Sequence, residues 1–191
     1  MWQVADLERH VDRRALLAGD DPAEPPYWAY LWAGAVALAE AVPRAAGRVV
    51  EVGCGLGLPG VVAAMRGAQV TMVDRVPAAL ARANASAVEN GHGDVALVAA
   101  DLTQGALRGR FDLVLAAEIL YERAAFGAVA SALAGLVAPG GRVLLADGGR
   151  IDTRAFYDGL DTAGFACTVR DVRRREEGAL VTIRLAELRL R

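Results

Sequence analysis

The chain has 191 residues and a mass of 20.0 kDa, about the size of one domain, and 54% of its residues are hydrophobic. All 21 basic residues are arginines, and the formal net charge is −2, which disfavours a protein that holds nucleic acid by its phosphates. The absence of lysine excludes a Schiff-base lysine, and two cysteines with two histidines provide neither a disulfide framework nor a multi-histidine metal site. We therefore expect one domain over residues 1–191, with no metal, no nucleic-acid partner and no separate substrate domain.

The N-terminal 43 residues predict two helices separated by a proline-rich turn. The spacing of apolar residues from Val4 to Leu17 indicates a short amphipathic helix, and an alanine-rich helix ends near Pro43. Met1–Arg14 lacks a basic start followed by an apolar run, so no secretion signal is expected. The apolar stretch Ala33–Val42 is too short to span a bilayer and contains Glu40, so we expect a cytoplasmic protein with no membrane partner.

From residue 44 onward, short apolar runs alternate with helical patterns, which predicts a doubly wound α/β sheet. The predicted helices are Val61–Arg66, Pro77–Asn90, Phe126–Val137 and Thr153–Ala163. The predicted strands are Arg48–Val52, Gln69–Val73, Val95–Ala100, Phe111–Ala116, Arg142–Ala146, Phe165–Arg173 and Ala179–Leu188. The last two strands are joined by a charged turn over 174–178 that is too short for a crossover, so they must pair antiparallel. We expect this turn, with its arginines and glutamates, to be a solvated hairpin tip.

A glycine-rich loop follows the first strand and precedes a helix. Glycines let the backbone turn sharply and approach a ligand, and a helix starting at Pro59 presents free N–H groups. From Gly55 to Gly60 the loop matches the dinucleotide pattern G-x-G-x-x-G. Counted from Glu51, however, it reads E-x-G-x-G-x-G, which resembles the first motif of class I S-adenosylmethionine (SAM)-dependent methyltransferases. We expect Cys54 to be a small buried residue rather than a nucleophile.

Acidic residues close the second and third strands. Asp74 follows the second strand, where a carboxylate accepts from ribose hydroxyls in both NAD and SAM enzymes. Its alternative role is to cap the helix that begins at Pro77. Asp101 follows the third strand, and its alternative role is to cap a turn at Thr103.

Three further segments carry a more specific resemblance. The fourth strand is followed by acid-x-x-Tyr, from Glu118 to Tyr121, and residues 26–35 read PYWAYLWAGA. The fifth strand is followed by Ala-Asp-Gly-Gly-Arg, ending at Arg150. Together these segments resemble the seven-strand protein-lysine methyltransferases, in particular the branch that modifies the β-subunit of electron-transfer flavoprotein; bacterial members are often labelled predicted nicotinamide N-methyltransferases. That subgroup usually has aspartate where this chain has Glu118, and proline where it has Gly148.

The resemblance, which covers residues 25–188, implies a Rossmann-like, mostly parallel seven-stranded sheet of order 3-2-1-4-5-7-6 with strand 7 antiparallel. Residues 1–43 would form a helical lid segment on a core of residues 44–191. SAM would be the cofactor and S-adenosylhomocysteine (SAH) the product, with a protein lysine as the methyl acceptor. The implied cofactor-binding residues are Trp32, Glu51, Gly53, Cys54, Gly55, Gly57, Leu58, Asp74, Arg75, Asp101, Leu102 and Ala117.

Individual roles follow from the same resemblance. Asp101 would accept from the adenine amino group, and Trp32 would pack beside the cofactor, although an aromatic helix start buried on the sheet is an equal alternative for Trp32. Glu118 and Tyr121 would be catalytic, orienting the acceptor amine and helping to remove its proton. If their segment turns helically, the three-residue spacing places both side chains in one cleft. Arg150 and the N-terminal aromatic residues are the next candidates for the acceptor site.

Other functions stay open at this level. A small-molecule N- or O-methyltransferase has the same fold, and a non-catalytic SAM-binding protein has the same loop. A NAD-binding oxidoreductase is disfavoured by the acidic residue Glu51, the terminal hairpin and the lack of room for a substrate domain. The sequence leaves the acceptor, protein or small molecule, and the oligomeric state undetermined.

Overall fold

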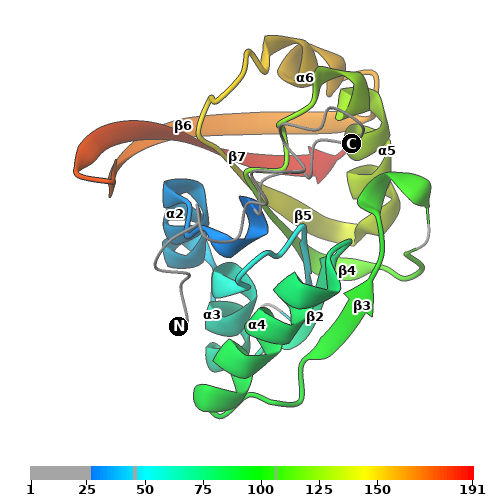
Figure 1. The fold of residues 1–191 in the computed structure, drawn as a ribbon. Coiled ribbons are helices and arrows are strands. Elements are labelled where there is room, and N and C mark those ends of the chain that lie inside the picture. Colours follow the sequence, from blue (N-terminus) through cyan, green and yellow to red (C-terminus); the bar gives the residue numbers. More distant parts are fainter. Residues whose placement is uncertain (1–26, 45–46, 106) are drawn as a thin grey trace, which may run out of the picture.

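A computed structural model describes residues 27–44, 47–105 and 107–191, and within them the chain folds around one seven-stranded sheet (Figure 1). The strand order is β3-β2-β1-β4-β5-β7-β6, and the fold class and order predicted from the sequence are confirmed. The strands are β1 (Arg48–Val52), β2 (Gln69–Asp74), β3 (Ala96–Ala99), β4 (Phe111–Ala117), β5 (Val137–Asp147), β6 (Phe165–Glu176) and β7 (Ala179–Leu190). β7 pairs antiparallel with both β5 and β6, and the other neighbouring strands pair parallel.

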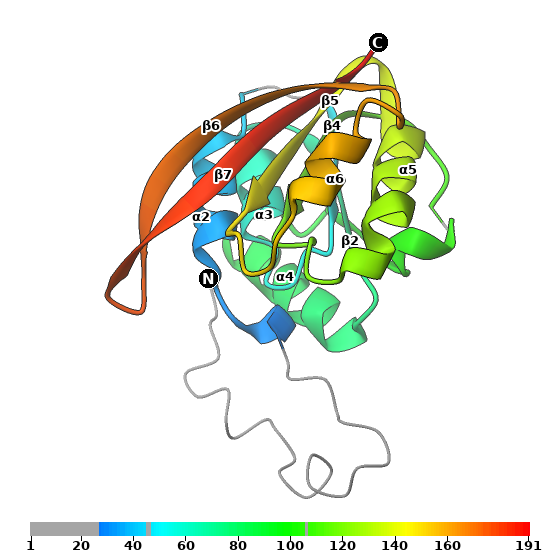
Figure 2. The ribbon, with the colours of Figure 1, turned by 90° about the horizontal axis from the view of Figure 1, so that it is seen from above.

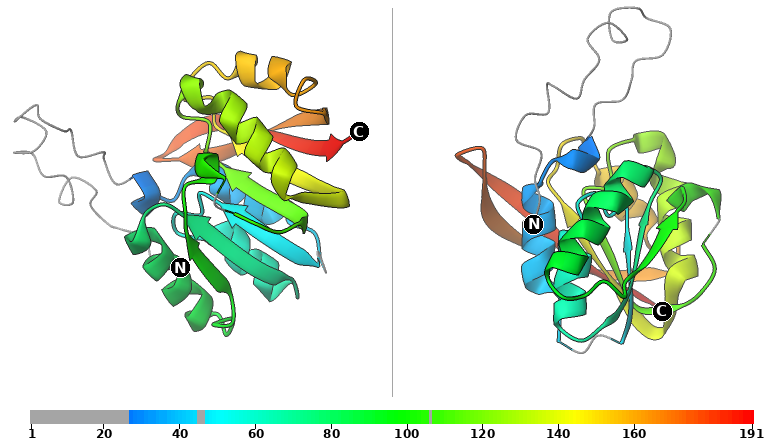
Figure 3. Two further views of the ribbon diagram at one scale, coloured as in Figure 1. Left: turned by 90° about the vertical axis from the view of Figure 1, so that its right-hand side faces the viewer. Right: turned by 60° about the horizontal axis from the view of Figure 1, so that its bottom comes forward.

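Helices cover both faces of the sheet (Figure 3). The α-helices are α2 (Ala33–Ala41), α3 (Leu58–Met65), α4 (Pro77–Glu89), α5 (Phe126–Leu136) and α6 (Arg154–Gly159). Short 3-10 turns are η2 (Tyr27–Ala29), η3 (Leu102–Gln104) and η4 (Arg123–Ala125). The predicted helix over 4–17 and the proline-rich turn lie outside the described residues. No described helix is long and apolar enough to cross a membrane, and the described residues contain no cluster of metal-ligating side chains.

The central strands divide the core into two halves because successive side chains point to opposite faces. Val49 and Leu113 pack with α2, α3 and α4 on one face, whereas Val50 and Val114 pack with α5 and α6 on the other. All four side chains are almost fully buried. The mostly apolar sequence of β1 and β4 is therefore explained by burial on both faces, as is usual for parallel strands.

The C-terminal hairpin is longer than the sequence predicted. The predicted turn over 174–178 is wrong in extent: Arg174 and Glu176 still belong to β6 and pair with Val181 and Ala179. Only Glu177 and Gly178 form the turn, and both have a left-handed backbone, with φ 49° and 81°. Such a two-residue turn matches the twist of the paired strands, which lets the ladder continue to the tip. The hairpin extends beyond α2 (Figure 2).

Candidate active site

The glycine loop lies at the carboxyl end of β1, the edge at which doubly wound sheets bind ligands. Gly55 and Gly57 have left-handed backbones with φ 50° and 75°. A Cβ at Gly57 would lie 2.7 Å from the Ala83 Cβ, so α4 packs against this point of the loop. A Cβ at Gly55 would lie 3.0 Å from the Trp28 carbonyl oxygen, so η2 lies against the other side of the loop. Both conformation and space at these positions therefore require glycine.

Glu51 supports this loop from beneath. Its carboxylate is 2% exposed, and its Oε2 accepts a hydrogen bond from the Gly60 N–H at 2.8 Å. Burial raises the pKa of Glu51 to about 8, although the Gly60 hydrogen bond opposes the shift. Because Gly60 lies in the first turn of α3, Glu51 holds the beginning of that helix against β1.

Asp74 connects the end of β2 to the glycine loop. Its Oδ2 accepts from the Gly55 N–H and its Oδ1 from the Val76 N–H, both at 2.9 Å. Each carboxylate oxygen has two lone pairs, so both keep capacity for a further donor. Cys54 is buried, as expected, and burial raises the pKa of its thiol well above the usual range.

Asp101 adopts the capping role that was its alternative. Its Oδ1 accepts from both the backbone N–H and the hydroxyl of Thr103, at 2.8 and 2.7 Å. These bonds lower the pKa of Asp101, and the nearby charge of Arg75 contributes in the same direction. Leu102 begins η3 and is half-buried. Capping occupies only one carboxylate oxygen, so it does not exclude a ligand at the other.

Aromatic residues before α2 form one wall of the site. The Trp32 indole N–H donates to the Tyr27 carbonyl oxygen at 3.0 Å, and its ring lies 4.4 Å from the Tyr30 ring, centroid to centroid. The guanidinium carbon of Arg150 lies 3.7 Å from the Trp32 ring centroid. This is a cation–π contact, and it fixes Arg150 on the indole.

Glu118 follows β4 in an unusual conformation. Its φ is 56°, a left-handed value that non-glycine residues rarely adopt and that concentrates at functional sites. Its side chain is 7% exposed; Oε2 accepts from the Gly148 N–H at 3.2 Å and lies 3.3 Å from the Arg150 Nε. Its buried Oε1 has no hydrogen-bond partner among the described residues, and a Cβ at Gly34 would overlap it.

The electrostatic surroundings of Glu118 are mixed. Burial raises the pKa of this carboxyl, and Arg150 and the Gly148 N–H oppose the shift. Asp147 and Glu176 add smaller contributions that raise it. The net direction is upward, so Glu118 binds a proton more readily than an exposed glutamate does.

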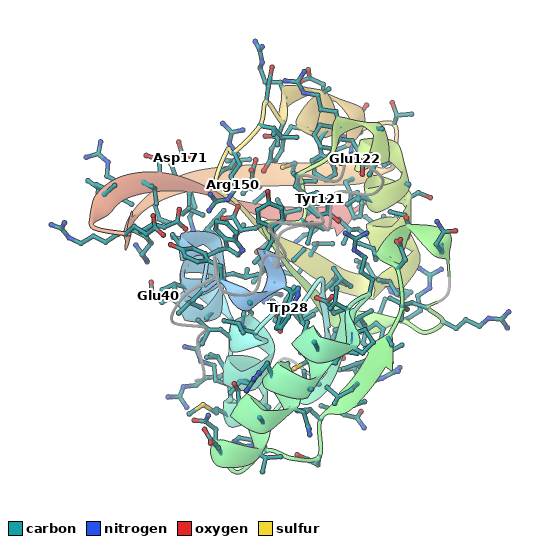
Figure 4. The ribbon with its side chains drawn as sticks, viewed as in Figure 1. Trp28, Glu40, Tyr121, Glu122, Arg150 and Asp171 are labelled. Carbon is teal, nitrogen blue, oxygen red and sulfur yellow. The ribbon has the colours of Figure 1, made fainter. Side chains whose placement is uncertain are left out.

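The condition under which Glu118 and Tyr121 would share a helical face is not met. Residues 118–122 form no helix, because the next turn, η4, begins only at Arg123. The side chain of Glu118 is 7% exposed, whereas Tyr121 is 55% exposed and lies farther toward α5 than Arg150 does (Figure 4). The loop does reach the glycine loop, since a Cβ at Gly53 would lie 2.9 Å from Ile119 Cγ2.

The predicted site residues therefore separate into two groups. Those around the glycine loop are Glu51, Gly53, Cys54, Gly55, Gly57, Leu58 and Asp74; Arg75, Asp101 and Leu102 follow at the ends of the next two strands. Trp32 and Glu118 meet through Arg150, and Ala117 ends β4 just before Glu118.

Sequence reasoning missed one residue of this site and one relationship within it. Glu176, expected in a solvated tip, has a side chain only 14% exposed and pairs with Arg150 at 3.1 Å. The two departures from the subgroup motif, Glu118 and Gly148, prove to be in contact: a Cβ at Gly148 would lie 2.8 Å from Glu118 Oε1. The sequence pattern does not signal this contact, because the two positions lie 30 residues apart in the chain.

Several known proteins are similar to parts of this chain. Residues 49–141 match the methyltransferase domain family. EEF1A lysine methyltransferase 3 of Mus musculus is 33% identical over 103 residues, covering 52% of this chain and 44% of that protein. Protein N-lysine methyltransferase METTL21A of Danio rerio is 40% identical over 93 residues, covering 45% and 42%. The matches span less than half the length of these curated relatives.

The chain is also similar in sequence to an O-methyltransferase and in fold to two solved methyltransferase structures. The ubiquinone biosynthesis O-methyltransferase of Dechloromonas aromatica is 36% identical over 107 residues, covering 56% of this chain and 46% of that protein. A TehB-like SAM-dependent methyltransferase from Corynebacterium glutamicum superposes with a TM-score of 0.66 at 16% identity, over 96% of this chain and 97% of that chain. The N-methyltransferase NodS from Bradyrhizobium japonicum, in complex with SAH, gives 0.64 at 19% identity, over 96% of each chain. At these identities, the structural likeness shows the fold alone.

The chain has the seven-stranded fold of class I SAM-dependent methyltransferases, and its residues 49–141 match the methyltransferase domain family. Within that class, it resembles the protein-lysine methyltransferases.

Proposed function

We propose that this protein transfers a methyl group from SAM to the side-chain nitrogen of a protein lysine. The observation that carries the proposal is Glu118, a buried carboxylate in a left-handed conformation, held by Arg150 on a loop that contacts the glycine loop. Similarity to lysine methyltransferases supports this acceptor.

The residues around the glycine loop fit SAM, and we name them the donor side: residues 53–57, Asp74 and Asp101. The left-handed glycines leave backbone without Cβ atoms beside the beginning of α3. Asp74 has lone pairs for the ribose hydroxyls, and Asp101 has one carboxylate oxygen for the adenine amino group. SAM supplies an activated methyl group when bound, so the protein has to align the acceptor with it and exclude water.

Glu118, Arg150, Trp32 and Glu176 form what we name the acceptor side. A lysine amine attacks only when neutral, and a partly apolar pocket lowers the pKa of a buried amine. Glu118 Oε1 is buried without a partner and accepts from the amine N–H, which orients the nitrogen lone pair. The raised pKa of Glu118 suits a group that takes up the proton released by methylation. Tyr121, exposed on the same loop, would contact the acceptor as it enters.

Tritiated SAM added to the protein with a cell lysate tests the proposal. We expect label in protein, on lysine, and we expect acetylation of the lysate lysines beforehand to abolish it. A panel of SAM, SAH, NAD and NADP in a thermal-shift assay checks the cofactor independently, with SAH expected to stabilise the protein most.

A small-molecule acceptor is the second candidate, because an O-methyltransferase of ubiquinone biosynthesis is similar over a comparable stretch. In that case the label would enter small metabolites and acetylation would have no effect. Label in neither fraction, despite stabilisation by SAH, would favour a SAM-binding protein without transferase activity.

A further inference from the structure

Glu176 lies near the tip of the C-terminal hairpin, yet it contacts two other parts of the site. Its carboxylate accepts from the Ala33 N–H, the first amide of α2, at 2.9 Å. Both of its oxygens lie 3.1 Å from the Arg150 Nη2. Its side chain is 14% exposed, so this pairing is shielded from solvent far more than a typical surface ion pair.

Arg150 is consequently held through two of its nitrogens. Its Nε faces Glu118 Oε2 at 3.3 Å, its Nη2 faces Glu176, and its plane lies against the Trp32 ring. A guanidinium bound through one nitrogen can rotate about that contact, whereas two carboxylates bound to two different nitrogens fix its plane. The hairpin is itself fastened to α2, because Arg174 pairs with Glu40.

Resting on the proposed function, we propose that Glu176 is a positioning residue of the acceptor side: it holds Arg150 against Trp32, and Arg150 in turn orients the Glu118 carboxylate toward the acceptor. The hairpin tip is then part of the active site. The last two strands, which extend one end of the sheet, would then also contribute to the active site.

The substitution Glu176→Gln tests this link selectively. Glutamine retains an oxygen for the Ala33 N–H, so the cap of α2 survives, but it loses both the negative charge and the second acceptor oxygen that hold Arg150. Asp171→Asn is the matched control, since Asp171 is an exposed carboxylate on the same strand (Figure 4). Glu176→Asp keeps the charge on a shorter side chain and should lie between the wild type and Glu176→Gln.

The direction in which the Glu118 titration moves is the decisive measurement. Arg150 lowers the pKa of Glu118 more strongly than Glu176 raises it, and burial, the Gly148 N–H and Asp147 complete the surroundings. If Glu176→Gln releases Arg150, Glu118 should therefore titrate at higher pH; if Arg150 stays in place, it should titrate at slightly lower pH. Carbon-13 NMR of the glutamate carboxyls, assigned with Glu118→Gln, measures this shift without any methyl acceptor.

Transfer from tritiated SAM to lysate protein provides the second measurement. We expect Glu176→Gln to lose roughly 10- to 100-fold in rate through misplacement of the acceptor groups, with SAH affinity within threefold of the wild type. We expect Asp171→Asn to match the wild type in both measurements.

The positioning role is overturned if the Glu118 titration in Glu176→Gln stays in place or moves to lower pH, or if the transfer rate is unchanged. If the wild type labels no fraction at all, the proposed function fails, while the titration still decides whether Glu176 holds Arg150. Should Glu176→Gln fail to fold, the same two measurements on Glu176→Asp decide the question.

Discussion

The donor and acceptor sides of this site are held together by different kinds of interaction. On the donor side, backbone groups dominate: Asp74 binds two backbone amides, and Asp101 caps its own turn. On the acceptor side, charged side chains from separate elements meet, with Arg150 placed between Glu118 and Glu176. A cofactor shared by a whole class is suited to a backbone cradle, whereas an acceptor that varies within the class is met by side chains that vary with it.

The largest expected effect separates the two sides directly. Glu118→Gln should keep SAH affinity within a few-fold but lose at least about 100-fold in methyl transfer, the scale of a positioned acid–base group. Calorimetry with SAH and transfer from tritiated SAM measure the two quantities. If SAH affinity falls along with the rate, Glu118 belongs to the donor side and the division is wrong at that residue. Tyr121→Phe, on the same loop but exposed, is the companion variant and should also leave SAH binding intact.

The substitution Asp74→Ala tests the donor side by its effect on SAH affinity. Asp74 accepts from two protein amides, and in the proposed site it would also accept from the ribose hydroxyls. Removing its carboxylate should weaken SAH about 10- to 100-fold, since a hydrogen bond to a charged group contributes roughly 1.5–3 kcal/mol. The glycine loop also loses its Gly55 contact, so part of the loss reflects a less ordered loop. Unchanged SAH affinity in calorimetry would remove Asp74 from the cofactor site.

Glu51, beneath the donor side, makes the free energy of unfolding depend on pH. Its pKa is raised from 4.5 to about 8 in the folded protein, so the folded state binds a proton more tightly than the unfolded state does. The contribution is fully present below about pH 4.5 and is lost as pH rises through about 8, on the order of 1 kcal/mol per pH unit at most. Urea unfolding of the wild type and Glu51→Gln from pH 5 to 8 should show a flatter profile for the variant. Parallel profiles would mean that the pKa of Glu51 is not raised in the folded protein.

The residues of the donor side could be located from the sequence more completely than those of the acceptor side. The glycine loop, Asp74 and Asp101 lie next to strand ends, so local patterns located them, and only the choice between ligand and cap stayed open. The acceptor side joins residues that are 26 or more positions apart in the chain: Glu118, Arg150 and Glu176. Glu176 reaches Arg150 only because β6 and β7 stay paired as far as Glu176. A two-residue turn with a left-handed Glu177 allowed that continuation, and side-chain pattern alone does not signal such a turn at glutamate.

The contact between Glu118 and Gly148 predicts that the two departures from the subgroup motif compensate each other. Gly148→Ala should lower transfer about tenfold, because its Cβ would lie 2.8 Å from Glu118 Oε1 in a packed site. In a Glu118→Asp background, where the carboxylate is shorter, the same alanine should cost much less, with a coupling of roughly 0.5–3 kcal/mol. Additive losses in the double-mutant cycle would show that the two positions act independently.

The smallest expected effect concerns Asp101, whose two possible roles the structure leaves compatible. Asparagine keeps an oxygen for Thr103, so Asp101→Asn preserves the cap and changes only the charge offered to the adenine amino group. SAH affinity should fall by no more than about tenfold, because one charged hydrogen bond becomes a neutral one. An inosine analogue of SAH, which lacks the amino group, should bind the wild type poorly and be discriminated against less by the variant. Equal discrimination in calorimetry would mean that Asp101 only caps η3, and that the adenine end of the donor side is recognised by shape and apolar contact rather than by a side-chain acceptor.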